Sequence, residues 1–252
     1  MHTRRLAVPL LTAIAFAALP NTVMAQTPAP PPPPPGWIGS ASAGLALTSG
    51  NSDTSTVNAA YELKRDTGGN LVLKSAGLLV WGKSEGELTS DRLALDGRVE
   101  RRLSDRTSLF GAAQYLRDSF KAIEYLVSPT VGVTHLLVKN DRSELGVDAG
   151  IGIVMEKDTG LDLDTDGAIT AGQQFIHKLT ATTELRERVG ALWVMDDFSD
   201  ALYTFGIGLA ASITAGTQLK FEFLDTYKSK PAVAGVQKND IAILMSFVYK
   251  FD

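Results

Sequence analysis

The 252-residue chain contains no cysteine, only three histidines, and no long apolar run beyond its first 25 residues. Without cysteine the chain cannot form a disulfide, a cysteine–metal site or a lipidated N-terminal cysteine. No later stretch approaches the roughly 20 consecutive apolar residues of a transmembrane helix, which argues against a helical membrane protein. The formal net charge of −4 provides no basic surface, so nucleic acid is not expected as a partner.

The start of the chain has the features of an export signal. Arg4 and Arg5 precede an apolar run, and small or apolar residues lead up to Ala25. This pattern predicts a signal peptide over residues 1–25 that is removed on export. Residues 26–35 are rich in proline and predict a stiff polyproline II linker in the periplasm, with docking to a proline-binding partner as the alternative.

From Gly36 onward, apolar residues alternate with small or polar ones in runs that are separated by turn residues. Alternation of this kind predicts β-strands with one apolar face. Twelve strands are expected, near residues 36–48, 54–65, 71–82, 91–103, 107–117, 123–137, 143–156, 166–177, 181–195, 200–213, 216–228 and 239–251.

The last of these runs indicates where the apolar face points. Every second residue from Ile241 to Phe251 is large and apolar, and the series closes on aromatics. A soluble sheet buries such a face, whereas an outer-membrane barrel turns it towards lipid. We therefore expect an all-β fold over residues 36–252. It is a transmembrane antiparallel up-and-down β-barrel of about 12 strands, surrounded by lipid in the bacterial outer membrane.

The connections between the runs alternate in length. Short breaks near residues 67–70, 104–106, 139–141, 177–179 and 214–216 alternate with longer polar segments at 83–90, 157–165 and 229–238. Outer-membrane barrels have short periplasmic turns and longer outer loops, so both termini are expected in the periplasm. Pro129 lies inside the sixth run, where its missing N–H predicts a bulge or a local bend.

Aromatic residues are expected in two bands at the two membrane interfaces. The outer band would comprise Trp81, Tyr115, Tyr125, Trp193, Tyr203 and Tyr227. The inner band would comprise Trp37, Phe110, Tyr249 and Phe251.

Charged residues concentrate on the opposite face of the strands, which would line the lumen. Neighbours two apart on one strand share a face at about 7 Å, so opposite charges in such a row lie close together. The rows could form a selectivity ring, or a mutually neutralised network that fills the lumen; their mixed signs favour the network. The two rows are Asp96, Arg98, Glu100, Arg102 and Glu184, Arg186, Arg188, with Glu62, Lys64, Lys220 and Glu222 as further candidates.

Catalytic and metal-binding patterns are sparse. His135 and His177 are the only histidines after the signal peptide, and both are expected near periplasmic strand ends, away from any outer-face serine or aspartate. We therefore expect no enzyme and no cofactor. The acidic stretch Asp162–Asp166 resembles the first half of an EF-hand loop. Its twelfth position is Gln173 and no helices flank it, so a solvated loop is favoured over a weak cation site.

Several stretches resemble a known bacterial family. The segments 37–39, 44–54, 103–111 and 118–129 are similar to the salt-induced outer-membrane protein family, an uncharacterised group also described as domain of unknown function 481. The resemblance covers essentially all of residues 36–252. It implies an outer-membrane barrel whose expression is tied to salt or envelope stress in some members, and it implies no catalytic residues.

Two classes of function therefore stay open. The first is a structural or envelope-stress barrel with a largely charge-neutralised lumen, and the second is a narrow passive channel for small solutes or ions. About twelve strands lie between side-chain-filled small barrels and wide porins, so strand number does not decide. In both cases the barrel assembly machinery is an expected partner during biogenesis, although Asp252 follows the terminal aromatic Phe251 that many barrels end on.

Overall fold

The computed structural model describes residues 36–48, 54–84 and 87–251. The expected signal peptide and linker lie outside the described residues. So do Asp252 and residues 49–53, which form part of one segment that resembles the known family. Within them the chain forms twelve strands and one short 3₁₀ helix, η1. The elements are β1 (Trp37–Thr48), β2 (Thr54–Asp66), β3 (Leu71–Ser84), β4 (Glu87–Arg102), β5 (Thr107–Asp118), η1 (Ser119–Lys121), β6 (Ile123–Lys139), β7 (Ser143–Asp158), β8 (Leu163–Lys178), β9 (Thr183–Val194), β10 (Ala201–Ser212), β11 (Thr217–Lys228) and β12 (Asn239–Phe251).

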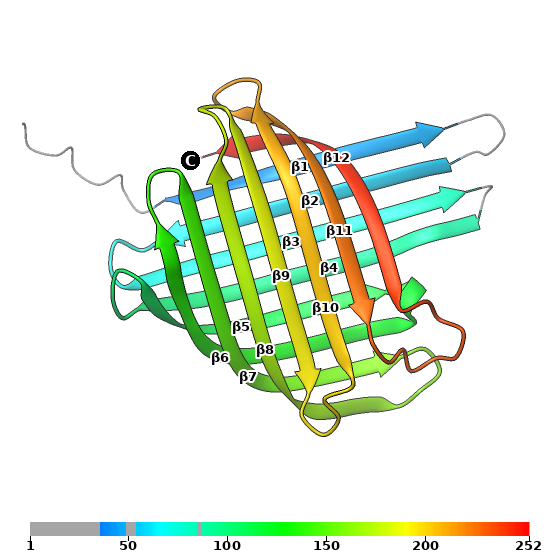
Figure 1. Cartoon of the computed structure of the whole chain (residues 1–252). Coiled ribbons are helices and arrows are strands. Elements are labelled where there is room, and N and C mark those ends of the chain that lie inside the picture. Colours follow the sequence, from blue (N-terminus) through cyan, green and yellow to red (C-terminus); the bar gives the residue numbers. More distant parts are fainter. Residues whose placement is uncertain (1–35, 49–53, 85–86, 252) are drawn as a thin grey trace, which may run out of the picture. The chain divides into compact units, whose positions relative to one another are not determined.

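The strands form a closed antiparallel barrel, in which each strand pairs with its neighbours in sequence and β1 pairs with β12 (Figure 1). The expected all-β, up-and-down architecture of twelve strands is confirmed. Among the described residues, no helix is long and apolar enough to cross a membrane. We call the end that carries the short connections, the start of β1 and the end of β12 the turn end, and the opposite end the loop end. The expectation that the turn end faces the periplasm stays a prediction.

The alternation in sequence becomes an alternation between the two faces of the barrel wall. Away from the strand ends, odd-numbered residues pair with odd-numbered residues of the neighbouring strand, and even-numbered with even-numbered ones. In these parts of every strand, the odd-numbered side chains therefore face outward, and the even-numbered ones face the lumen. In β12 the outward residues from Ile241 to Tyr249 are each more than half exposed, whereas Leu244 and Val248 point inward and are buried. The apolar outer face that the sequence predicts is therefore present.

Two of the three long loops expected from the sequence are much shorter in the structure. Strand β4 already begins at Glu87, and Lys157 of β7 pairs with Leu163 of β8. Polar residues can continue a ladder beyond the membrane because water satisfies their side chains. Their polarity therefore does not mark the end of a strand. The third segment, 229–238, is a loop as expected.

The bulge expected at Pro129 is absent. Val127 lies opposite Met155 and Thr130 opposite Gly152, so the register between β6 and β7 is unchanged across the proline. This register places the carbonyl of Ile153 opposite Pro129, which has no N–H to donate. The buried Ser128 hydroxyl donates to that carbonyl instead, at 3.0 Å. A neighbouring side chain thus replaces the missing backbone donor.

The aromatic bands are largely as expected, with one error. At the loop end the Trp193 indole Nε1 donates to the Tyr203 hydroxyl at 3.0 Å, and the Tyr203 ring lies 6.2 Å from that of Tyr227. Phe110 does not belong to the band at the turn end, because its even-numbered position in β5 faces inward and only 5% of it is exposed. This ring is part of the lumen.

The outward placement of Leu209 in β10 yields a test of the membrane-facing surface. Leu209→Arg should destabilise the inserted barrel by about 2–4 kcal/mol, because a charge at mid-membrane depth loses its hydration. Heat-modifiable migration on gels and the level of folded protein in membranes measure the effect. Leu209→Met, which keeps the site apolar, should behave as wild type. Normal folding of the arginine variant would contradict the assignment of this face.

Candidate functional site: the barrel lumen

The inward side chains divide the lumen into two layers. Towards the turn end they are mainly charged, and we call this the charged layer. Towards the loop end, strands β5 to β10 contribute a cluster of buried apolar side chains, which we call the apolar plug. The division arises because each strand changes composition along its inner face. In β4, for example, the inward residues run from Ala94 to Arg98 and Glu100.

Arg98 connects four strands within the charged layer. Its Nε donates to Glu100 Oε1 at 2.7 Å, and its Nη1 lies 4.0 Å from Asp148 of β7. The guanidinium also donates to the Thr134 hydroxyl on β6. Lys74 of β3 lies 2.9 Å from the same Glu100 carboxylate. Two cations therefore share a carboxylate that is largely buried, and each charge has an opposite charge close by.

The ring of Phe110 supports this arginine from one side. The Arg98 guanidinium carbon lies 3.7 Å from the ring centroid, a cation–π distance. Space for the ring exists because Gly132 and Gly150 follow Phe110 in the same row across β6 and β7. A Cβ atom at these glycines would lie 2.7 Å and 3.2 Å from the ring edge. The sequence shows each of these residues, but the registers that bring them together depend on strand pairing.

A second cluster surrounds Arg186 of β9. Its Nε lies 2.5 Å from Glu184 Oε1, and its Nη1 lies 3.0 Å from Glu62 of β2, on the other side of the lumen. Lys220 and Glu222 of β11 pair at 3.0 Å. A cavity of about 40 Å³ lies between these strands, lined by Glu62, Arg186 and Lys220 among others. This volume suffices for about one water molecule.

The expected rows do not merge into one network. Among the described residues no ion pair joins the Arg98 cluster to the Arg186 cluster, and neither Asp96 nor Arg188 has an ion-pair partner within 4.0 Å. Arg188 is exposed within the charged layer. Arg102 lies at the turn end, where it pairs with Asp66. The charged layer is thus two neutralised clusters beside an accessible arginine.

The apolar plug is the part of the lumen that sequence analysis missed. Its inward side chains come from six strands, β5 to β10, and all are at least 90% buried. They form one contact cluster, with the partly buried Ala94 of β4 packed against its edge. The charge pattern of the inner face does not reveal these residues. Each strand contributes only one or two of them, so no single strand shows an apolar inner face. The members are Leu116, Ile123, Leu126, Val154, Ala168, Leu192, Val194 and Leu202.

Two ion pairs cross the barrel at the loop end, beyond the apolar plug. Lys228 of β11 lies 2.8 Å from Glu156 of β7 and 3.1 Å from Asp200. Lys121 of η1, whose side chain is fully buried, lies 3.0 Å from Asp240 of β12. Nearby, Arg92 of β4 donates to the Thr226 hydroxyl of β11. These contacts close the loop end around the plug.

The outer connections are also tied to each other. Lys230 Nζ lies 2.5 Å from Asp197, which links the loop 229–238 to the segment between β9 and β10. The hydrogen bond from Lys230, followed by those from Ser199, lowers the pKa of Asp197 to about 2. A depressed pKa means that this contact contributes above the ordinary aspartate pKa and is lost only as pH falls towards about 2.

The acidic stretch that resembles an EF-hand is not a loop. Strand β8 begins at Leu163, so Asp164 and Asp166 lie in extended backbone on one face of a strand. Extended backbone does not wrap around an ion as an EF-hand loop does. In the described part of the chain, no group of three or more acidic, histidine or cysteine side chains is placed to hold a metal ion.

Both histidines lie on the outward face near the turn end, each beside a hydroxyl. His135 Nδ1 is 3.0 Å from the Thr107 hydroxyl, and His177 Nδ1 is 2.8 Å from the Ser143 hydroxyl. In each pair, the histidine and the hydroxyl residue lie opposite each other on neighbouring strands. The hydroxyl partners were missed from the sequence because they lie 28 and 34 residues away.

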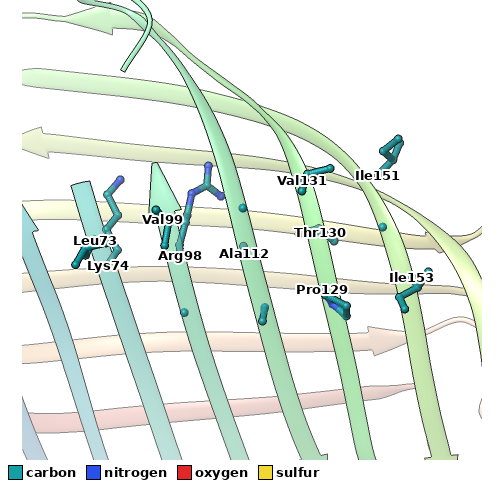
Figure 2. Close-up of a pocket in the computed structure, with 14 residues that line it drawn as sticks. Leu73, Lys74, Arg98, Val99, Ala112, Pro129, Thr130, Val131, Ile151 and Ile153 are labelled. Carbon is teal, nitrogen blue, oxygen red and sulfur yellow. The ribbon is translucent and has the colours of Figure 1, made fainter. Parts of the chain in front are cut away.

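A hollow of about 810 Å³ is lined by residues from five adjacent strands, β3 to β7. Figure 2 shows Lys74 and Arg98 extending side by side from neighbouring strands of this region. The wall is thin here because Gly97, Gly111 and Ala113 contribute little side-chain volume on the outward face. Apolar side chains, including Val131, flank these small residues. In a bilayer, acyl chains cover this outward surface.

The glycine row beneath Phe110 can be tested directly. Gly132→Val should lower stability by about 1–3 kcal/mol, because its side chain would overlap the Ala149 carbonyl and the Phe110 ring. Gly97→Ala is the matched control, since a Cβ at Gly97 meets nothing within 4 Å. The thermal midpoint of the folded barrel in detergent measures both. Equal midpoints for the two variants would show that Phe110 does not need the glycine row.

Comparison with solved structures identifies outer-membrane barrels. An outer-membrane channel from Pseudomonas putida F1 is 14% identical, with 87% of this chain and 96% of that chain covered and a TM-score of 0.52. The NanC porin is 8% identical, with 84% and 96% covered and a TM-score of 0.47. The translocator domain of the autotransporter NalP from Neisseria meningitidis is 14% identical, with 85% and 87% covered and a TM-score of 0.46. At such identities the likeness concerns the fold.

Comparison with curated proteins finds no match. A closed barrel with an apolar outer face satisfies its backbone without water, and among bacterial membranes it belongs to the outer one. Comparison with protein families matches residues 41–251 to a protein of unknown function, DUF481. The match covers most of the chain and nearly all of the barrel, and it agrees with the family that the sequence motifs resemble. The chain is a member of the DUF481 family.

Proposed function

We propose that this protein is a non-catalytic, structural barrel of the outer membrane whose lumen is closed at rest. The observation that carries the proposal is the apolar plug. Its eight side chains from β5 to β10 lie in the loop-end half of the lumen and are almost completely buried. An ion or polar solute that entered this layer would lose its hydration without finding a polar partner, which is costly.

The charged layer supports the same proposal from the other side of the lumen. A channel that selects by charge is usually lined by a ring of one sign. Here Arg98 and Lys74 are matched by Glu100 and Asp148, and Arg186 is matched by two glutamates. Mixed signs at these distances satisfy charges that could not face lipid. They hold the strands together more than they attract one kind of ion.

The proposal includes outer-membrane lipid as the surrounding partner and the barrel assembly machinery as the partner during biogenesis. A role in salt or envelope stress follows from the family resemblance and fits a barrel that reinforces the envelope without conducting. Loss of the protein should then reduce survival under osmotic stress. Survival of a deletion strain that carries a correctly inserted Arg98→Ala barrel shows what the cell needs. Full rescue would mean that the outer surface of the barrel suffices, and poor rescue would mean that the stability of the lumen matters.

A narrow passive channel for small solutes or ions is the second candidate, and one observation favours it. Arg188 is exposed within the charged layer, and the side chain of Lys74 is 38% exposed. The turn-end half of the lumen is thus accessible to water, as a vestibule would be. For conduction, the apolar plug would have to move.

Single-channel recording of the purified wild-type barrel in a planar bilayer tests the closed lumen. We expect no steady conductance, because the apolar plug leaves no hydrated path. A steady, ohmic conductance would overturn the proposal and establish the channel. Porin-free bilayers of the same lipid provide the baseline.

Arg98→Ala tests whether the charged layer holds the barrel together. The variant leaves Glu100 and Asp148 with fewer cations, so the thermal midpoint should fall, corresponding to about 2 kcal/mol or more of lost stability. Arg188→Ala is the control, since Arg188 has no ion-pair partner within 4.0 Å among the described residues, and its midpoint should change little. Equal midpoints would indicate a fully hydrated lumen in which neither arginine is structural.

A further inference from the structure

The seam between β1 and β12 is only half paired. Its register runs from Gly39 opposite Phe251 to Ala43 opposite Phe247, at the turn end. Beyond these pairs both strands continue towards the loop end, each hydrogen-bonded on its other side to β2 or β11. In Figure 1 the two strands lie side by side at their turn ends and point apart at their loop ends. Every other pair of neighbouring strands is joined over most of its length.

The unpaired part of β12 lies within the apolar belt. Its outward side chains Ile241, Ile243 and Met245 are about 60% exposed, as is Leu45 on β1. Backbone groups at that depth have no water to bond with, so an open strand edge there is unfavourable. The register already present, if continued, would place Leu45 opposite Met245 and would remove both edges. Some interaction must therefore hold β12 away from β1.

Lys121 of η1 supplies that interaction. Its buried ammonium lies 3.0 Å from Asp240, at the loop end of β12, and donates to the carbonyls of Lys238 at 2.9 Å and Gln237 at 3.4 Å. The Asp118 carboxylate accepts from the backbone N–H of Lys121, which fixes the short helix in place. The loop end of β12 is therefore bound to η1, across the lumen, in place of β1.

The point at which the seam opens is also defined. Gly44 of β1 lies between Asn58 of β2 and Ser246 of β12, and the Ser246 hydroxyl donates to the Asn58 side-chain oxygen at 2.7 Å. A Cβ at Gly44 would lie 2.1 Å from the Met245 carbonyl and 2.6 Å from the Asn58 amide nitrogen. Only glycine leaves room for this bond over β1. The bond joins β2 to β12 over β1, at the point where the pairing of β1 with β12 stops.

We propose that β12 is a gate with two positions, and that the structure shows the closed one. In the closed position Lys121 holds the loop end of β12 against η1. In the open position β12 pairs with β1 along its length, and the backbone bonds gained there replace the contacts of Lys121. Strand β11 moves with β12 because the two are paired throughout, so Thr226 leaves Arg92 and the loop end widens around the apolar plug. The inference rests on the proposed closed lumen and adds the movement that opens it.

Two cysteine pairs test the gate, and the absence of native cysteine makes them the only thiols. Leu45→Cys with Met245→Cys joins the unpaired part of the seam in the continued register. Ala43→Cys with Phe247→Cys, two residues away on the same face, joins the paired part and is the matched control. The rate of disulfide formation under a mild oxidant is measured on gels, and conductance is recorded before and after reduction.

We expect the control pair to cross-link rapidly without any change in conductance. The 45–245 pair should cross-link at least tenfold more slowly, and its disulfide should produce a conductance that dithiothreitol abolishes. Lys121→Met, or Asp240→Asn if the first variant folds poorly, should raise the 45–245 rate several-fold and leave the 43–247 rate unchanged. Each of these results supports a β12 that Lys121 holds away from β1.

Two results would overturn the gate. Equal cross-linking rates for the two pairs would show that the seam is already closed along its length. A fully cross-linked 45–245 barrel that stays silent would show that pairing does not open the lumen, while the closed-lumen proposal would stand. Steady conductance of the wild type before any cross-link would instead overturn the proposed function itself.

Discussion

The structure depends on one constraint: inside a membrane, each backbone N–H and C=O must find its partner within the protein. An antiparallel sheet meets this demand only by closing on itself, which requires the last strand to pair with the first; here the two are paired only at the turn end. The constraint extends to single residues. At Pro129 the chain lacks a donor, the Ser128 hydroxyl bonds to the carbonyl opposite, and the register is the same on both sides of the proline.

Closure creates an interior that must then be filled, and the chain does this differently in its two halves. In the loop-end half, buried apolar side chains from β5 to β10 pack together beside the ion pairs of Lys121 and Lys228. The turn-end half uses charges, and charges require closer arrangement, since each must meet an opposite partner to offset its lost hydration. Arg98 illustrates the cost, because placing one guanidinium requires a carboxylate, an aromatic ring and two glycines that make space for that ring.

Much of the fold could be predicted from the sequence because the outward face of a strand is encoded locally. A period of two residues needs no knowledge of the neighbouring strand, so the lipid-facing residues of β7 and β12 follow from alternation alone. The partners inside the lumen could not be predicted in this way. Lys74 meets Glu100 and Phe110 meets Arg98 only once the registers between strands are known. Those registers are set by hydrogen bonds between distant segments, not by local pattern.

The same distinction explains why the seam was invisible in the sequence and why it matters. The alternation in β1 and β12 predicts two complete strands, and nothing local distinguishes residues that pair from residues that do not. The difference comes from a competition at the loop end of β12. Backbone bonds to β1 would satisfy a strand edge, whereas the contacts of Lys121 satisfy a buried ammonium that has no water. If β12 joined β1 while η1 stayed in place, that ammonium would lose Asp240 and two carbonyls together. The seam can therefore close only when Lys121 gives up these contacts, which couples the completeness of the barrel wall to the closure of its lumen.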